Sequence, residues 1–364
     1  MVTPSFISTA QQLSDRLLLQ ESEKKAIEKV AQVYPFRIPE FYAALMDREN
    51  PVCPIRLQAV PSIQELKVGG VPDPLGEAAI RVTPSFLKRY PRRGVFLVSS
   101  ECAMYCRFCN RKRAVGKGHA WEQSTEETLR YLEKDEEVSE VILSGGDPMM
   151  LAPERLAYIL ERLRSNKRID VVRVSTRFPV VFPEGIQREH LKAIRKHAPI
   201  WVITHINHPK EVTSQFAEVV NMLRKAGAVL ISQTVLLRGV NDCPHILSGL
   251  FERLVRLGVK PYYLFQLDDA QGAQHFKVRL SAGVALMREL RRDISGLCIP
   301  QYALDITGGV GKVPLETTYV GKRKGKSLSL RNPAGETGTY TDDGQKSRCS
   351  NCGLCQGNKA AGKR

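Results

Sequence analysis

The sequence contains no run of the roughly 18–20 consecutive apolar residues that a membrane-spanning helix needs. Residues 1–20 also lack the basic start and the continuous apolar core of a secretion signal. No segment repeats in tandem with a period of roughly 20 to 50 residues, which argues against a repeat architecture. We therefore expect a soluble, globular, cytoplasmic protein without a membrane partner.

The cysteine pattern gives little indication of disulfide bonds. Most of the nine cysteines fall into two tight triplets, which is typical of metal sites in a reducing compartment. The triplets are Cys102, Cys106, Cys109 and Cys349, Cys352, Cys355. Of the others, Cys53 and Cys298 are expected to be buried structural thiols.

The charge balance is basic, because 54 Lys and Arg oppose 38 Asp and Glu to give a net charge of +16. Such a balance is compatible with nucleic acid binding, but the basic residues are spread along the chain. The one dense run, Lys322–Lys326, is typical of a solvated turn. A site for anionic small molecules explains the charge equally well, so we do not expect a nucleic acid partner.

The first triplet has the spacing C-x₃-C-x₂-C and directly follows the apolar segment Gly94–Val98. Iron–sulfur clusters are normally held by four cysteine thiolates, so three thiolates leave one iron of a [4Fe–4S] cluster open to another ligand. A structural zinc loop or three unrelated thiols are the alternatives, although zinc requires a fourth protein ligand nearby. The spacing is similar to that of radical S-adenosylmethionine (SAM) enzymes, which cleave SAM to a 5′-deoxyadenosyl radical.

After Tyr90 the chain alternates short β-branched segments with amphipathic helical ones, as in βα units that build a parallel sheet. With 364 residues and 43% hydrophobic content, it can bury a large core. Repeated βα units close into a full or partial barrel. Six strands are expected, at Gly94–Val98, Val141–Ser144, Val171–Ser175, Ile200–Thr204, Ala228–Thr234 and Pro261–Gln266. Helices are expected at Thr125–Lys134, Pro153–Ser165, Arg188–His197, Gln215–Ala226 and Pro244–Leu257.

Polar residues follow the ends of these predicted strands. They are the cysteine loop, Gly145-Gly146-Asp147, Thr176-Arg177, His205 to His208, Gln233 and Asp268. Functional residues of such barrels lie at the carboxyl ends of the strands. The sequence therefore predicts one active rim.

Gly145 and Gly146 allow a ligand to approach the backbone closely, since neither carries a Cβ atom. Gly145-Gly146-Asp147 is commonly only a turn, but beside the cysteines it is similar to the radical SAM motif that receives the SAM amino group.

Glycines surround a single lysine at Gly308-Gly-Val-Gly311-Lys312. This is not a phosphate-binding P-loop, which needs Gly in place of Ile306 and Ser or Thr in place of Val313. A lysine after glycines is commonly at a hairpin tip. Crowded glycines also suit a Schiff base with the flat cofactor pyridoxal 5′-phosphate (PLP).

Taken together, residues 90–340 resemble the lysine 2,3-aminomutase family of radical SAM enzymes that use PLP. The matching runs are Cys102–Cys109, Ser144–Asp147, Ser175–Pro179, Thr204–Pro209, Val235–Cys243, Pro261–Tyr263 and Gly308–Pro314. The resemblance implies conversion of L-lysine to L-β-lysine (3,6-diaminohexanoate). It also implies a [4Fe–4S] cluster, SAM and PLP as cofactors, and a low-potential electron donor such as flavodoxin or ferredoxin.

The resemblance also assigns roles to individual residues. Lys312 is implied to hold PLP and Arg111 to bind the substrate carboxylate. Asp268 and Asp305 are implied to bind the distal ammonium group, which two carboxylates can desolvate and position. SAM contacts are implied for Gly145, Gly146, Asp147, His205 and Gln233, and a PLP-phosphate contact for Arg89. His205, Gln233 and Arg89 can equally be rim residues that satisfy backbone groups.

The family further implies a four-cysteine zinc site in a homo-oligomer, here Cys243 with Cys349, Cys352 and Cys355 of another subunit. Four thiolates suit structural zinc. The C-x₂-C-x₂-C spacing of the tail does not match the family's own spacing, so an auxiliary iron–sulfur cluster stays open as an alternative.

The expected fold is α/β, a partial (β/α)₆ TIM-like radical SAM barrel. Residues 1–90 form a helical N-terminal cap, residues 91–304 the barrel, and residues 305–364 a PLP- and metal-binding segment. Two related activities are alternatives: a glutamate 2,3-aminomutase, and the aminomutase that supplies β-lysine for elongation factor P. Glutamate is disfavoured because its side-chain carboxylate faces two aspartates. A radical SAM RNA-modifying enzyme is the alternative from another class, and such an enzyme has no use for Lys312.

Overall fold

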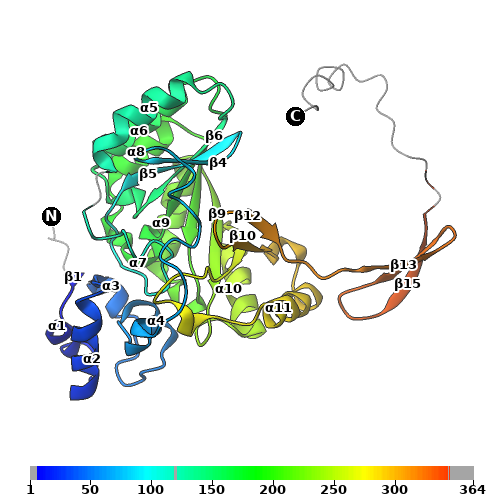
Figure 1. Ribbon diagram of the computed structural model, residues 1–364, viewed down its shortest axis with the longest axis horizontal. Coiled ribbons are helices and arrows are strands. Elements are labelled where there is room, and N and C mark those ends of the chain that lie inside the picture. The colour runs from blue at the N-terminus through cyan, green and yellow to red at the C-terminus, as the bar shows by residue number, and fades with distance from the viewer. Residues whose placement is uncertain (1–5, 119–120, 343, 345–364) are drawn as a thin grey trace. The chain divides into compact units, whose positions relative to one another are not determined.

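The computed structural model describes residues 6–118, 121–342 and 344, and it divides into two compact units, Met1–Glu316 and Thr317–Arg364 (Figure 1). The first unit contains the barrel and every described residue of the predicted active rim. Within the described residues, no helix has both the length and the apolar content needed to span a bilayer.

A ten-stranded sheet forms the centre of the first unit, in the order β12-β11-β10-β9-β8-β7-β6-β5-β4-β3. Strands β5 to β11 are parallel, whereas β3 and β4 at one edge and β12 at the other are antiparallel. The bounds are β3 Arg81–Thr83, β4 Phe86–Tyr90, β5 Arg93–Ser99, β6 Glu140–Gly145, β7 Val171–Thr176, β8 Ile200–His205, β9 Ala228–Leu236, β10 Lys260–Gln266, β11 Gln301–Ile306 and β12 Gly311–Pro314.

The six strands expected from the sequence are β5 to β10, and each predicted range overlaps the observed one. Successive side chains alternate between buried and partly exposed along β6 and β7. Because the sheet order has two ends, the barrel is partial, as predicted. The sequence did not predict β11 as a seventh parallel strand or the antiparallel strands at the two edges.

The major helices cover the outer side of the sheet (Figure 1). In α6, for example, Leu156, Ile159, Leu160 and Leu163 recur at helical spacing and are fully or almost fully buried. The helices of this layer are α5 Thr125–Lys134, α6 Pro153–Ser165, α7 Phe178–Val181, α8 Arg188–Lys196, α9 Ser214–Lys225, α10 Pro244–Arg256 and α11 Leu280–Asp293. The five predicted helices are confirmed with ends that differ by at most one residue.

The N-terminal region is helical, as predicted, but its helices are short. They are α1 Ala10–Ser14, α2 Glu21–Ala31, α3 Glu40–Ala43 and α4 Pro54–Ala59, with a two-stranded sheet of β1 Phe6–Ile7 and β2 Ile38–Pro39. Tyr42 on α3 and Gln58 on α4 are completely buried. This region therefore contributes side chains to the interior.

The second unit contains a three-stranded antiparallel sheet of β13 Val320–Lys324, β14 Ser327–Arg331 and β15 Thr337–Thr341. The basic run at Lys322–Lys326 spans the β13–β14 turn, where Gly325 has a φ of +61°, so the expected solvated turn is confirmed. The unit boundary follows Glu316, later than the segment boundary expected at residue 305, because β11 and β12 pair with the main sheet.

Candidate active site

The carboxyl ends of the parallel strands carry the residues expected there. The cysteine loop follows β5, Gly145 ends β6, Arg177 follows β7, and His205 ends β8. Gln233 lies in β9 beside His205 in the strand register, Asp268 follows β10, and Asp305 lies near the end of β11. The tertiary structure thus places the predicted site residues along one rim.

The three thiols of Cys102, Cys106 and Cys109 line a single small cavity. Burial raises the pKa of Cys109 to about 11, and burial together with Asp147 and the other two thiols raises the pKa of Cys102. No three His, Cys, Asp or Glu side chains in the described residues are arranged to hold one metal ion. Thiols spread around a cavity suit a cluster of several irons, whose ligands are farther apart than those of a single ion.

Gly145 and Gly146 pack against the backbone that leads into the cysteine loop. A Cβ atom on Gly145, whose φ is +114°, would lie 2.4 Å from the Ser99 carbonyl oxygen, and one on Gly146 would lie 2.2 Å from that of Glu101. The Gly146 amide donates to the Ser99 carbonyl at 2.6 Å. Only glycine fits at these two positions, so the motif fixes the start of the loop.

The carboxylate of Asp147 is buried and joins β6 to β7. It accepts hydrogen bonds from the Thr176 hydroxyl at 2.7 Å and the Arg177 amide at 2.8 Å. Burial raises its pKa, while these donors favour its ionised form. The observed partners of Asp147 are therefore protein groups, and its predicted contact with SAM stays a prediction.

His205 lies beside the cysteine loop. Its ring is 5.4 Å from that of Phe108, and its Nε2 atom is 3.1 Å from the Asn207 Oδ1 atom. Burial and the nearby charge of Arg177 lower the pKa of His205 to about 3, so the ring is neutral at neutral pH.

A second, larger cavity contains the Lys312 side chain. Lys312 lies in β12 opposite Asp305 of β11, and the two form an ion pair with an Nζ to Oδ2 distance of 2.7 Å. The Nζ atom also lies 3.9 Å from the centre of the Phe265 ring. Lys312 is therefore inside a strand, beyond the hairpin tip at residues 307–310. Other residues that line the cavity include Glu77, Arg89, Tyr90, Arg93, Arg111, Arg173 and Tyr263.

Arg89 reaches this cavity because Gly309 leaves space for it. A Cβ atom on Gly309 would lie 2.2 Å from the Arg89 Nη2 atom. The same nitrogen donates to the Leu75 carbonyl at 3.1 Å. Several cations and aromatic rings around a lysine amine suit a planar cofactor with a phosphate group, so these residues fit PLP.

Asp268 is close enough to Asp305, Lys312 and Arg111 for all three charges to affect its ionisation. Burial, with a contribution from Asp305, raises the pKa of Asp268 to about 6, although a 2.8 Å hydrogen bond from Asn110 and the two cations oppose the rise. Asp305 thus affects the ionisation of Asp268, and the expected convergence of the two carboxylates on one ammonium group stays a prediction.

Arg111 lines the Lys312 cavity and follows Cys109 by two residues. It forms an ion pair with Glu77 at 2.7 Å and donates to the Ser144 hydroxyl at 3.0 Å. Glu77 also pairs with Arg113 at 2.8 Å and is almost completely buried. No sequence pattern pointed to Glu77, which lies in an irregular, proline- and glycine-rich segment.

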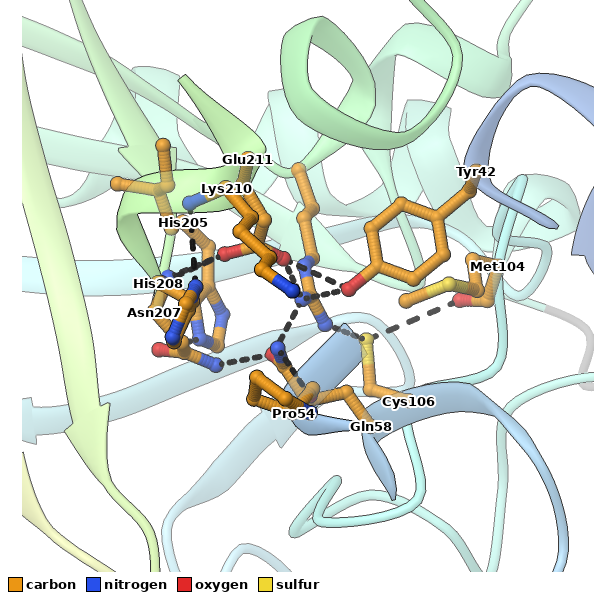
Figure 2. A network of polar contacts seen from close by, with 12 residues as sticks. Tyr42, Pro54, Gln58, Met104, Cys106, His205, Asn207, His208, Lys210 and Glu211 are labelled. Carbon is orange, nitrogen blue, oxygen red and sulfur yellow. Dashed lines mark hydrogen bonds and ion pairs between the residues drawn. The ribbon is translucent and has the colours of Figure 1, made fainter. Parts of the chain in front are cut away.

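A buried polar network around Arg177 was also missed. It joins Tyr42 and Gln58 of the N-terminal region to Glu211, Asn207 and Cys106 (Figure 2). Arg177 belongs to one of the motif runs and to the predicted rim, but no role followed from that position.

The predicted zinc site is described only in part. Cys243 precedes α10 as a half-buried free thiol, and Cys349, Cys352 and Cys355 lie outside the described residues. Cys53 and Cys298 are buried free thiols, as expected.

Comparison with known proteins gives consistent results. Residues 96–247 match the model of the Radical SAM superfamily. The L-lysine 2,3-aminomutase of Clostridium subterminale is 34% identical over 97% of this chain and 86% of its own length, and that of Methanococcus maripaludis is 36% identical over 93% and 80%. The glutamate 2,3-aminomutase of Clostridioides difficile is 33% identical over 93% of this chain and 81% of its own length.

Proposed function

The chain belongs to the lysine 2,3-aminomutase family and contains a radical SAM domain, and we propose that it converts L-lysine to L-β-lysine. The observation that carries this proposal is the charge arrangement around Lys312. Arg111 offers a cation for the substrate carboxylate, while Asp268 and Asp305 offer anions for the distal ammonium group. L-Lysine has a carboxylate at one end and an ammonium group at the other, and each is opposite in charge to the residues proposed to bind it.

In this proposal Cys102, Cys106 and Cys109 hold a [4Fe–4S] cluster, and Gly145, Gly146, Asp147, His205 and Gln233 surround SAM. Lys312 and Arg89 hold PLP. When bound, the cluster and SAM supply a hydrogen-abstracting radical, and PLP supplies a conjugated system for the migrating nitrogen. The cavity shared by the three thiols supports the cluster site, and the arginines and aromatic rings around Lys312 support the PLP site, whereas the SAM contacts stay a prediction.

The protein's own groups position the substrate and exclude water. Arg111 is already fixed by Glu77 and Ser144, so it can orient a carboxylate without further ordering. Asp305 forms an ion pair with Lys312. It must exchange this partner for the substrate ammonium when Lys312 is engaged with PLP. The Phe265 and Tyr263 rings, centred 3.9 and 5.0 Å from the Lys312 Nζ atom, cover part of the amine with apolar surface and limit its contact with water.

The alternatives differ in charge and chemistry. A glutamate substrate places a carboxylate against Asp268 and Asp305, and this repulsion favours lysine. The elongation-factor branch makes the same product but commonly lacks the zinc cysteines, so Cys243 and the tail triplet favour the use of free lysine. An RNA-modifying enzyme leaves the Lys312 cavity unexplained.

We further propose a structural zinc ion held by Cys243 of one subunit and the Cys349, Cys352 and Cys355 thiolates of another, within a homo-oligomer. Four thiolates are the usual ligand set of structural zinc. A flavodoxin or ferredoxin is the proposed electron donor, and the cytoplasm the proposed location. Metal analysis that finds extra iron and no zinc would instead indicate an auxiliary cluster.

The function is tested by anaerobic incubation of the purified protein with SAM, dithionite, PLP and one amino acid at a time, followed by product analysis. We expect 3,6-diaminohexanoate from L-lysine and no 3-amino product from glutamate. Formation of β-glutamate, with lysine unchanged, would overturn the assignment in favour of a glutamate aminomutase.

A further inference from the structure

Arg177 contacts the middle cysteine of the loop. Its Nη1 atom donates to the Cys106 Sγ atom at 2.8 Å, and the guanidinium group is almost completely buried. Among the described residues, Cys106 is the only one of the three cysteines whose sulfur accepts a hydrogen bond from a charged side chain. The three thiols are therefore electrostatically unequal.

The guanidinium group is held rigidly on its other side. Its Nη2 atom donates to Glu211 and to Gln58, both at 2.7 Å. Glu211 is fully buried and accepts further hydrogen bonds from the Tyr42 hydroxyl at 2.7 Å and the Asn207 amide at 2.7 Å. Figure 2 shows Tyr42, Gln58 and Glu211 pointing toward one another, with Cys106 nearby. Neither Arg177 nor Glu211 can turn away without leaving a buried charge unpaired.

A purely structural ion pair does not account for the sulfur contact. Glu211 already neutralises Arg177 and ties the loop after β8 to the N-terminal region. The Nη1 atom of Arg177 nevertheless donates to Cys106. Arg177 follows β7, whereas Cys106 lies in the loop after β5. This geometry delivers a fixed positive charge and an N–H donor to one sulfur.

We propose that Arg177 is a positioning residue that sets the reduction potential of the cluster bound through Cys106, and that Glu211 limits its effect. The inference rests on the proposed cluster. Hydrogen bonds to the sulfurs and the local net charge are the means by which a protein sets such potentials. A donor and a positive charge stabilise the reduced, more negative cluster, so Arg177 raises the potential. The negative charge of Glu211 offsets part of that rise.

The test is the midpoint potential of the reconstituted cluster, measured by spectroelectrochemical titration without substrate or PLP. Arg177→Met is expected to lower the potential, because it removes both the donor and the cation. Glu211→Gln is expected to raise it, because it leaves the Arg177 charge uncompensated. Tyr42→Phe is the matched control: it removes two hydrogen bonds from the same network, one donated to Glu211 and one accepted from Arg177, without changing any charge, and it should leave the potential near that of the wild type.

Shifts of opposite sign cannot come from general loosening of the site, which affects both variants alike. The proposal is overturned if the iron-replete Arg177→Met and Glu211→Gln proteins have the wild-type potential, or if both shift in the same direction. If Arg177→Met does not assemble a cluster, the Glu211→Gln shift decides alone. A wild-type protein that binds no cluster at all refutes the proposed function instead, which keeps the two failures separate.

Discussion

The cysteine cavity and the Lys312 cavity differ in how firmly the charges beside them are held. Beside the cysteines, the side chains of Arg177 and Glu211 are 7% and 0% exposed, and those of Arg107 and Glu65 are 1% and 0% exposed. In the other cavity, the Lys312 and Asp305 side chains are 22% and 26% exposed and form a single ion pair. Buried ion pairs that do not rearrange suit a permanently bound cluster. A lysine that exchanges partners during turnover needs a more accessible ion pair.

The largest expected effect comes from Cys106→Ser. This change removes a cluster ligand, so we expect loss of the brown chromophore and of turnover, while PLP remains bound because Lys312 lies in the separate cavity. Iron content, PLP content and β-lysine formation are measured together. A variant that retains wild-type activity would end the radical SAM assignment.

Lys312→Ala is the counterpart in the Lys312 cavity. It removes the amine that attaches PLP, so we expect no covalently bound PLP and no β-lysine, while dithionite still drives SAM cleavage at the intact cluster. The measurement is mass spectrometry after borohydride reduction, with 5′-deoxyadenosine detected in parallel. PLP still attached to the variant would show that another lysine holds it.

Replacement of Glu65 tests how much the buried ion pairs beside the cysteine cavity contribute to stability. Glu65 accepts hydrogen bonds from Arg107 at 2.5 Å and Lys112 at 2.7 Å, and Glu65→Gln leaves these buried cations without their anion. We expect a loss of about 3–5 kcal/mol in the free energy of unfolding, measured by chemical denaturation. Glu189→Gln, in an exposed pair with Lys192 at 3.4 Å, is the control and should leave the free energy of unfolding close to that of the wild type.

Asp305→Asn tests the substrate assignment in the Lys312 cavity. Loss of one carboxylate leaves the substrate ammonium half-compensated, so we expect kcat/KM for lysine to fall by an amount equivalent to about 2–5 kcal/mol. Asp305 also pairs with Lys312, so PLP content is measured on the same samples. Wild-type kcat/KM with full PLP would exclude Asp305 as a substrate ligand.

The smallest effect concerns Asp268 and pH. Its folded-state pKa is about 6, above the ordinary value, so its ionisation costs stability as the pH rises through 6. Asp268→Asn should therefore stabilise the ligand-free protein by about 1–3 kcal/mol at pH 7 and progressively less toward pH 4. Denaturation curves across this range test the prediction. Asp269→Asn, in a surface pair with Lys277, is the control and should show no such trend.

Most of the barrel could be predicted from the sequence, because a buried strand or an amphipathic helix is specified by residues within a few positions of one another. Strands β5 to β10 and helices α5, α6, α8, α9 and α10 were located in this way. Strand β12 was missed, since Gly311–Pro314 has no strand periodicity and exists as a strand through its pairing with β11.

By itself, the sequence determined the strand order along the chain, the residues at the strand ends and the spacing of the cysteine and lysine motifs. Only the tertiary structure decided that Glu77 holds Arg111, that Glu211 holds Arg177 and that Asp305 holds Lys312. Glu77 and Glu211 each lie 34 positions from their arginine, and Tyr42 lies 169 positions from Glu211. Contacts over such separations depend on how the strands and the N-terminal region pack, and a local pattern of residues does not predict that packing.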